Sequence, residues 1–174
     1  MIQLRRARPA DAPGIATVHV SAWRNAYAGL LPDEFLSGLS DVRRAVQYDE
    51  EIRAGRGVFV ALGNGGVIGF STVGHPRAAR LADGEIETLY VLDDWRDRGV
   101  GRRLLRAGAL HLAQGGCRSA FLWVLRDNPS RWFYERMGGR AAMEGTTRVA
   151  GVAVPQTAYV WKPIELLLSA PPPS

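Results

Sequence analysis

Residues 89–105 read LYVLDDWRDRGVGRRLL, and this stretch decides the fold that the sequence predicts. It opens with apolar residues typical of a strand and passes through a short connection rich in Asp and Arg. From Val100 onward, apolar residues recur every three or four positions, as they do along one face of a helix. The stretch therefore predicts a strand, a tight connection and an amphipathic helix in direct succession.

The predicted helix leads into a second strand. Its apolar face continues to Leu112, its arginines lie on the opposite face, and Gly115 and Gly116 end it. Residues 119–125 (SAFLWVL) then read as a buried strand. A strand, a helix and a strand in this order predict two parallel strands joined by a right-handed crossover.

Upstream of this unit, the sequence predicts one strand, three helices and an antiparallel meander. The alternation of IQLRRA is typical of a half-buried strand, and pairs of Pro and Asp mark helix starts. The run GNGG at 63–66 reads as a hairpin turn between two β-rich runs. The expected elements are a strand at 2–7, helices at 11–27, from 32 onward and at 41–54, and strands at 58–62, 67–73 and 84–92.

Downstream, residues 128–137 predict a short helix that Gly138 and Gly139 end, and the remainder, notably 152–162 (VAVPQTAYVWK), supplies one or two late strands. No repeat or internal boundary interrupts the pattern, so we expect a single domain over residues 1–165. Residues 166–174, which end in SAPPPS, are expected to form a flexible tail. The fold class predicted is α/β, of the α+β kind with a mixed sheet.

Composition favours an anionic ligand and a reducing compartment. The formal net charge is +5, and Lys162 is the only lysine among 22 basic residues, so the rest are arginines. Cys117 is the only cysteine, which excludes an intrachain disulfide. The first residues lack the apolar run of a secretory signal, and the uncharged stretch 57–76 reads as a hairpin instead of a membrane span. We therefore expect a cytoplasmic protein without a membrane partner.

The connection between the first strand and the helix has the pattern Arg96-x-x-Gly99-x-Gly101. Glycine lets the backbone approach a ligand closely, and the first amides of a helix attract negative charge. Arginines at 96, 98, 102 and 103 add planar donors that suit phosphate oxygens. The segment therefore predicts a pyrophosphate-binding site.

Two common phosphate loops do not fit this segment. A Walker loop needs Gly-Lys-Ser/Thr, and the segment contains no lysine. The dinucleotide fingerprint needs a third glycine where Leu104 stands and an acidic residue about 20 positions on, where residues 119–121 offer none. The sequence therefore disfavours both ATP in a Walker site and a nicotinamide cofactor.

The strand, the R-x-x-G-x-G connection and the helix resemble the acetyl-CoA-binding motif of the GNAT superfamily of N-acetyltransferases. The segment 122–139 (LWVLRDNPSRWFYERMGG) is similar to a second motif of that superfamily, with its Asn, Tyr and Met-Gly. The segment 18–36 (VHVSAWRNAYAGLLPDEFL) is similar to the first two helices of many bacterial members. The resemblance spans roughly residues 2–162, and three motifs in order are more specific than one.

This resemblance implies a GNAT-like fold, with a central, mixed and mostly antiparallel sheet of about six to seven strands and about four flanking helices. It implies acetyl-CoA as cosubstrate, with the backbone amides of Val100, Gly101, Arg102 and Arg103 holding its pyrophosphate. The strand from Leu89 to Val91 would pair with the pantetheine arm. Asn128 would contact that arm or a water, while its position before Pro129 equally suits a helix cap.

By the same resemblance, Tyr134 would protonate the departing thiolate as a general acid. The alternative is an aromatic residue that only packs beside its neighbours. Glu85 and Glu87 are candidates for the base that deprotonates the amine, and strand alternation places both on one face with Leu89 and Val91. For each carboxylate the alternative is a solvated charge on a strand face. Transfer would run by direct attack in a ternary complex.

Trp23 and Tyr27 lie four residues apart on the first helix, which edges the acceptor cleft in the resembling proteins. Core packing is the alternative for both. The acceptor would be a primary amine, either a small molecule or a protein N-terminus or lysine, and the superfamily's habit of dimerisation admits a homodimer. The histidines and Cys117 lack metal-ligand spacing, so no metal is expected.

Two other functions compete with acetyl transfer. A basic nucleic-acid-binding module would explain the charge, but no aromatic strand or recognition helix accompanies the arginines, so we expect no nucleic-acid partner. A non-catalytic sensor that binds CoA would keep the fold without the chemistry. The presence of Asn128 and Tyr134 argues against this second alternative.

Overall fold

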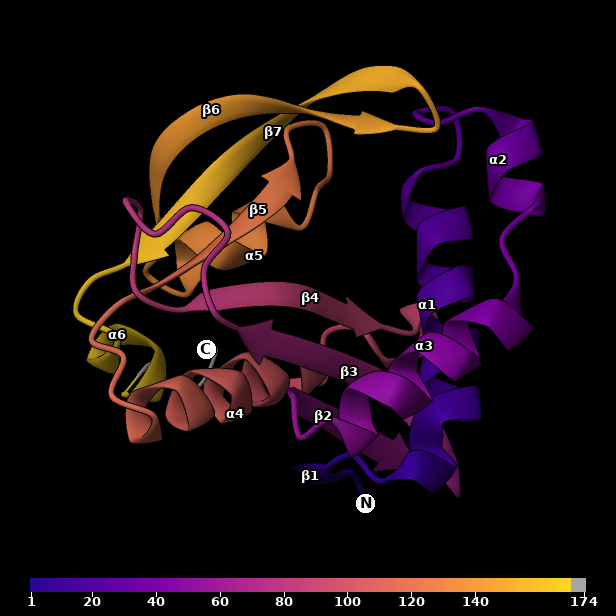
Figure 1. Cartoon of the computed structure of the whole chain (residues 1–174), viewed down its shortest axis with the longest axis horizontal. Helices are drawn as coiled ribbons and strands as arrows, with labels where there is room; N and C mark the ends of the chain where they lie inside the picture. The colour runs from indigo at the N-terminus through magenta and orange to yellow at the C-terminus, as the bar shows by residue number, and fades with distance from the viewer. Residues whose placement is uncertain (170–174) are drawn as a thin grey trace.

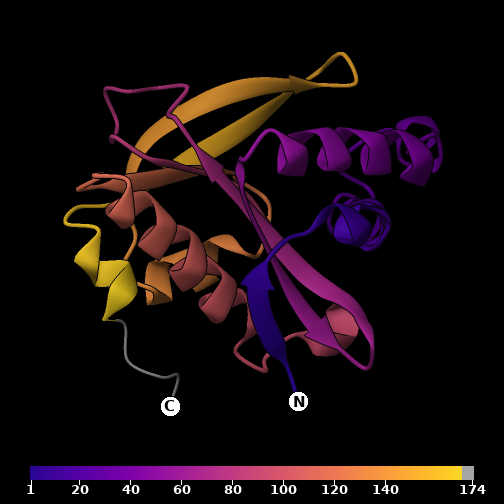
Figure 2. The same cartoon turned by 60° about the horizontal axis from the view of Figure 1, so that its bottom comes forward.

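A computed structural model describes residues 1–169 and shows a seven-stranded sheet with helices on both faces (Figures 1 and 2). The strand order is β1-β2-β3-β4-β5-β7-β6, and every neighbouring pair is antiparallel except β4 and β5. The strands are β1 (Gln3–Arg6), β2 (Gly57–Gly63), β3 (Gly66–Gly74), β4 (Glu85–Val91), β5 (Ala120–Leu125), β6 (Arg140–Val149) and β7 (Val152–Trp161). The mixed, mostly antiparallel sheet expected from the sequence is therefore confirmed.

Helices pack on the two faces of this sheet in separate groups. They are α1 (Ala12–Ala26), α2 (Asp33–Ser37), α3 (Asp41–Arg53), α4 (Val100–Gln114), α5 (Arg131–Arg136) and α6 (Glu165–Leu168). Figure 2 shows α4 on one side of the sheet and α1 with α3 on the other. The described residues contain more helices than the four or so expected. Only three of them are long, because α2, α5 and α6 are each six residues or shorter.

Two apolar clusters hold these layers together. On one face, the buried side chains of α1 and α3 pack on β2 and β3 around Ile15, Tyr48 and Phe70. On the other, Leu105 and Ala109 of α4 join a cluster that extends through β5, α5, β7 and α6. This second cluster buries the apolar face of α4 that the sequence periodicity predicted.

The GNGG run forms the hairpin turn that the sequence predicted. Asn64 and Gly65 both have positive φ, 50° and 79°, between the paired residues Gly63 and Gly66. Two such residues make the turn type whose twist matches antiparallel strands, and Asn-Gly is a preferred pair for it. The uncharged stretch 57–76 therefore belongs mainly to β2 and β3. Within residues 1–169, no helix has the length and apolar character needed to cross a membrane.

The parallel strands β4 and β5 pair at a single point and then diverge. Glu85 lies opposite Phe121, and no further residue of β4 has a partner in β5 among the described pairs. Figure 1 shows the two strands running apart beyond this point. The divergence leaves one edge of β4 without a neighbouring strand, and this edge forms a wall of the site described below.

Strand β4 contains a bulge that the sequence did not reveal. Ile86 pairs with Val73 and Thr88 pairs with Thr72, so Glu87 has no partner residue in β3. Ile86 packs toward α4, which directs its neighbours to the opposite face, whereas Leu89 packs toward α4 again beyond the bulge. The expectation that Glu85 and Glu87 share a face with Leu89 and Val91 is therefore wrong, because the extra residue resets the alternation.

Two short helices differ from the sequence prediction. The predicted helix at 128–137 is shortened to α5, and its N-cap is Ser130. Asn128 instead makes a turn, in which its Oδ1 accepts a hydrogen bond from the amide of Ser130 at 2.9 Å. Helix α6 lies partly in the expected flexible tail, because Leu167 is buried against the α4 cluster. The rest of that expected tail, 170–174, lies outside the described residues.

Candidate active site

A cleft of about 1280 Å³ opens where β4 and β5 diverge. Its walls come from α1, β4, the first turn of α4, β5 and the turn that leads into α5, and the β6–β7 hairpin contributes to it. The cleft brings together most of the residues singled out in the sequence. Those that line it are Trp23, Tyr27, Glu87, Leu89, Val91, Arg96, Gly99, Val100, Gly101, Arg102, Asn128 and Tyr134.

The first turn of α4 has the geometry of an anion-binding site. Gly99 is the N-cap residue and has φ 78°, a left-handed conformation that favours glycine. A Cβ added at Gly101 would lie 3.6 Å from the ring of Phe133, an ordinary contact, so packing within the protein does not require glycine there. Together with the positive end of the helix dipole, this open backbone fits a phosphate group.

The amides available at this turn end one residue earlier than the resemblance implied. The amide of Arg103 donates to the carbonyl of Gly99 at 3.1 Å, as the first intrahelical bond of α4. Its N–H is therefore committed to the helix. The amides that can face an anion belong to the residues before it, among them Val100 and Gly101.

The arginines near this turn divide into two groups. The guanidinium of Arg98 lies over the ring of Trp95, 4.9 Å from its centroid, and Nη1 of Arg103 donates to the carbonyl of Ile2 at 3.2 Å. Neither of these two side chains lines the cleft. Arg96 and Arg102 do line it. The sequence predicted a cluster of four arginines, and the structure directs two of them to contacts elsewhere.

The free edge of β4 presents backbone groups to the cleft. The amide of Leu92 donates to the carbonyl of Ile68 in β3 at 2.9 Å, so these opposite residues are a hydrogen-bonded pair. Because such pairs alternate along an antiparallel ladder, Leu89 and Val91 direct their N–H and C=O groups away from β3. These groups face the space left by the divergence of β5, where an extended ligand could pair with them as a strand would.

Tyr134 of α5 lies at the base of this space with its hydroxyl unpaired. Its side chain is buried, its ring lies near those of Phe133 and Trp161, and it lines the cleft. No hydrogen bond to its hydroxyl occurs within residues 1–169. Burial and the neighbouring Tyr27 raise the pKa of Tyr134 well above its usual value, so the phenol keeps its proton at neutral pH.

The α1 wall is joined to β4 and to the turn at Asn128. Nε1 of Trp23 donates to the hydroxyl of Tyr90 at 2.8 Å, and the Trp23 and Tyr27 rings meet edge to face. Burial raises the pKa of Tyr27, while hydrogen bonds with the side chains of Asn128 and Tyr90 oppose that rise. Tyr27 also packs in an apolar cluster with Leu125 of β5. Trp23 of α1 and its C-cap residue Tyr27 thus combine packing with a place in the cleft wall.

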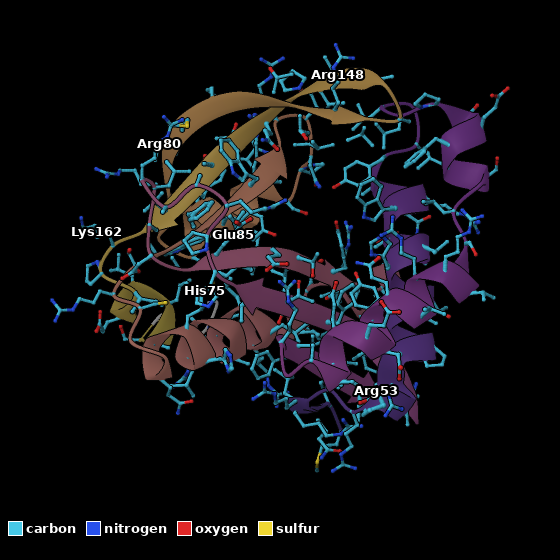
Figure 3. The ribbon with its side chains drawn as sticks, viewed as in Figure 1. Arg53, His75, Arg80, Glu85, Arg148 and Lys162 are labelled. Atoms are coloured by element: carbon cyan, nitrogen blue, oxygen red, sulfur yellow. The ribbon has the colours of Figure 1, made fainter. Side chains whose placement is uncertain are left out.

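Glu85 lies outside the cleft and is fully engaged. Its carboxylate has no exposed surface, and it accepts from the backbone amide of Arg77 at 3.0 Å and from Nε and Nη2 of the same residue. Figure 3 shows Glu85 in the interior, under the loop that joins β3 and β4. The pairing with Arg77 keeps this carboxylate out of the cleft wall.

Glu87 occupies the bulge and lines the cleft. It is half-buried, and desolvation raises the pKa of its carboxyl above the usual value, with the charge of Glu85 adding to the rise and Arg56 opposing it. A carboxylate with a raised pKa is a better proton acceptor than an ordinary one. The two acidic candidates therefore differ sharply in their surroundings.

Two residues on which the site depends, Tyr90 and Arg77, were not singled out in the sequence. Strand alternation places Tyr90 on the face opposite Leu89 and Val91, but no local pattern indicates that it accepts a hydrogen bond from Trp23. Arg77 lines the cleft from the β3–β4 loop, and no local pattern marks it, because its partner Glu85 is eight positions away along an irregular segment. Across residues 1–169, no group of three or more His, Cys, Asp or Glu side chains could hold a metal ion.

Comparison with known proteins agrees with this geometry. A family model described as "Acetyltransferase (GNAT) family" matches residues 21–139. The chain is 34% identical over 169 residues to the uncharacterized N-acetyltransferase YuaI of Bacillus subtilis, with 96% of each chain covered.

Solved structures share the fold. An N-acetyltransferase of Staphylococcus aureus Mu50 superposes with a TM-score of 0.74 at 21% identity, over 93% of this chain and 98% of the other. A putative acetyltransferase of Salmonella typhimurium, yncA, solved with its cofactor acetyl-CoA, superposes with a TM-score of 0.70 at 17% identity, over 100% of this chain and 98% of the other.

Proposed function

This chain belongs to the GNAT family of acetyltransferases and is an acetyl-CoA-dependent N-acetyltransferase, and we propose that it acetylates a primary amine by direct attack in a ternary complex. The observation that carries the proposal is the joining of three features in one cleft. These are the first turn of α4, the free edge of β4 and the unpaired hydroxyl of Tyr134.

The cleft suits acetyl-CoA along its length. Gly101 leaves space that a Cβ would fill, at a turn whose amides favour a pyrophosphate. From there, Leu89 and Val91 offer backbone donors and acceptors to the two amides of a pantetheine arm. When bound, acetyl-CoA supplies an electrophilic thioester carbonyl and a thiolate leaving group. The remaining walls, formed by α1 and the β6–β7 hairpin, are left for the acceptor.

Glu87 is the residue that we propose for accepting the proton of the acceptor amine, directly or through a water. It lines the cleft with a raised pKa, whereas both oxygens of Glu85 are held by Arg77. The carboxylate must be ionised to act, and the ammonium it deprotonates then attacks as a neutral amine. Backbone N–H groups of the free β4 edge would polarise the carbonyl that is attacked.

Tyr134 is the residue that we propose for protonating the leaving thiolate. Its buried phenol stays protonated at neutral pH and has no hydrogen bond within the described residues that would hold its proton elsewhere. The thiol that forms has a pKa of about 8.5, so transfer from a phenol requires close positioning. Asn128, which contacts Tyr27 beside it, would support the arm of the cosubstrate.

Two further points belong to the proposal. A cytoplasmic location is supported by the single cysteine, which suits a reducing compartment. A homodimer would follow the habit of the family.

A thiol-release assay tests the function. The purified chain is mixed with acetyl-CoA and a panel of primary amines, and release of free thiol is followed alongside calorimetric titration with acetyl-CoA. We expect acetyl-CoA to bind and thiol release to depend on the amine. The double-reciprocal plots should show intersecting lines, as a sequential mechanism requires. Parallel lines in the double-reciprocal plots, as for a covalent acetyl-enzyme, would contradict direct attack.

A further inference from the structure

We propose that the acceptor carries a carboxylate beside its amine, and that Arg77 binds this carboxylate while Glu87 faces the amine. The acceptor class is then an α-amino acid with an apolar side chain. The inference rests on the proposed function, because it concerns the second substrate of the same cleft. It follows from the placement of one arginine, from the character of the surrounding wall and from the charges that the cleft offers.

Arg77 stands at the cleft wall with most of its side chain exposed. It belongs to the loop between β3 and β4, its side chain is 72% exposed, and it lines the cleft together with Glu87. Glu87 feels its charge, which lowers the pKa of that carboxyl slightly against the larger effect of burial. A positive and a negative group therefore line the same cleft, close enough for their charges to interact.

The guanidinium of Arg77 is held along one edge only. Nε lies 3.2 and 3.1 Å from the two carboxylate oxygens of Glu85, and Nη2 pairs with the same carboxylate. Nη1 makes no hydrogen bond within residues 1–169. Because a guanidinium offers five N–H groups in a fixed plane, one carboxylate can occupy its Nε side while a second binds at the outer edge.

This arrangement gives the buried Glu85 a positioning role. Its side chain has no exposed surface, and it also accepts from the amide of Arg77, so both backbone and side chain of that residue are fixed. An arginine held in this way loses less conformational freedom when it binds a ligand than a free one does. The pairing thus leaves the outer edge of the Arg77 guanidinium, with Nη1, available to a ligand in the cleft that Arg77 lines.

The remaining acceptor wall is largely apolar or aromatic and carries no charge. It contains Trp23 of α1 and Tyr27 just after it, Leu125 of β5 and Val149 of β6, with the uncharged Thr147 and Gln156 of the β6–β7 hairpin. An apolar side chain of the acceptor would find contact there, because these residues supply area without fixed charge.

The charges in the cleft disfavour polycationic acceptors. Among the described residues that line it, Glu87 and Asp97 are the acidic ones, and Asp97 lies at the α4 end. A polyamine or an aminoglycoside would bring several ammonium groups to an acceptor end that holds one carboxylate and one arginine. An amino acid brings one charge of each sign and matches this pair.

Matched acceptors test the inference. L-Leucine, L-leucinamide and isopentylamine share the side chain but differ at the carboxylate, and kcat/KM for each is measured by thiol release with the full chain and acetyl-CoA. Rates are compared at equal concentrations of unprotonated amine. We expect the amino acid to be preferred at least about 10-fold over both analogues that lack the carboxylate, as a charged hydrogen-bonded pair predicts.

Variants assign the preference to Arg77. Arg77→Gln should bring the kcat/KM for L-leucine close to that for L-leucinamide. The double variant Arg77→Gln with Glu85→Gln should do the same without leaving Glu85 as an unpaired buried charge. The matched control is Arg80→Gln, a change at an exposed arginine of the same loop, which points outward near β6 in Figure 3 and should leave the ratio unchanged. If Arg77 had only a structural role, Arg77→Gln would lower kcat/KM for all three acceptors together and leave the preference for L-leucine unchanged.

The outcomes separate the two proposals. Equal or better use of the amide and the amine by the native chain would overturn the carboxylate site while acetyl transfer stands. A ratio that survives in the double variant would likewise remove Arg77 from recognition. Absence of thiol release with every amine would instead overturn the proposed function itself.

Discussion

The indole nitrogen of Trp23 donates to the hydroxyl of Tyr90 across 2.8 Å, and this bond ties α1 to β4 at the cleft. The Trp23 ring also packs edge to face against Tyr27, so the aromatic residues of this wall are connected through Trp23 to the strand that would carry the cosubstrate. The wall that faces the acceptor is thereby fixed relative to the edge that would hold the thioester. Orientation of two reactants in this way is a large part of catalysis by direct attack.

Tyr90→Phe should weaken this connection. The Trp23 indole N–H would lose its acceptor in a part-buried place, and we expect a loss of about 1–3 kcal/mol in the free energy of unfolding. The KM for the acceptor should rise while the affinity for acetyl-CoA is retained. Chemical denaturation and steady-state kinetics measure these effects, and a fall in acetyl-CoA affinity with an unchanged acceptor KM would refute the assignment of the wall.

Gly101→Ala should separate folding from cosubstrate binding. The new Cβ finds ordinary contacts with Phe133 and Val91, and alanine favours helix over glycine, so the melting temperature should hold or rise slightly. The same methyl group occupies space at the anion-binding turn, so the dissociation constant for acetyl-CoA should rise about 10-fold or more, as the loss of one charged hydrogen bond predicts.

Calorimetry and thermal unfolding check the Gly101 prediction. Gly66→Ala is the matched control, because a Cβ there meets open space away from the cleft. Undiminished affinity in Gly101→Ala would show that the turn is not the pyrophosphate site.

Tyr134→Phe should reduce turnover without reducing cosubstrate affinity. Loss of a general acid typically costs 10²- to 10⁴-fold, and we expect kcat to fall by about 100-fold. Because the hydroxyl has no hydrogen bond within the described residues, its removal should change stability little. Tyr159→Phe serves as control, since its hydroxyl bonds Glu135 and it does not line the cleft. Equal turnover in Tyr134→Phe and the native chain would remove this residue from the mechanism.

Glu87→Gln should change the pH dependence of the reaction. The native enzyme needs an ionised Glu87, whose pKa is raised by burial, so its rate should fall as the pH drops through that raised value. The glutamine variant should be slower throughout and should lack this acidic limb. Profiles of kcat/KM for the acceptor against pH, taken under saturating acetyl-CoA, test this prediction. An identical acidic limb in the native enzyme and in Glu87→Gln would point to another base.

His19 should make folding sensitive to acid. It is buried, its Nδ1 lies 2.8 Å from the Tyr48 hydroxyl, and burial lowers the pKa of the imidazole from 6.5 to about 4. Between these values the unfolded chain binds more protons than the folded one, so the free energy of unfolding falls as the pH drops from 6.5 to 4. A shift of this size corresponds to about 3 kcal/mol.

Denaturant titrations at several pH values test the His19 prediction. His19→Gln should lose this component of the slope, whatever its effect at neutral pH, whereas His75→Asn, a change at an exposed loop residue, should keep it. A slope that is the same in the native chain and in His19→Gln would assign the acid sensitivity to other groups.

Much of the fold was predictable because its signals are local. The apolar period from Val100 to Leu112 reports a helix face, and Asn64-Gly65 permits only a tight hairpin turn. Each of these patterns depends on neighbours within a few residues. The candidate turn could be located for the same reason, since Gly99 has a left-handed backbone conformation that favours glycine and Gly101 follows it at a fixed spacing.

The chemistry of the site was less predictable, because it depends on residues brought together from distant segments. Sequence alternation put Glu85 and Glu87 on one face with Leu89, yet the bulge opposite Thr72 and Val73 reset that alternation. A bulge arises from pairing with another strand, and no pattern within the β4 sequence alone predicts it.

By itself, the sequence determined the order and type of the main elements, the position of the candidate anion-binding turn of α4 and the family to which the chain belongs, because periodicity, glycine placement and motif order are written in consecutive residues. The tertiary structure decided which carboxylate lines the cleft and which is paired with Arg77, and which arginines line the cleft. These outcomes depend on burial and on partners that lie far apart in the chain, and such proximity exists only after folding.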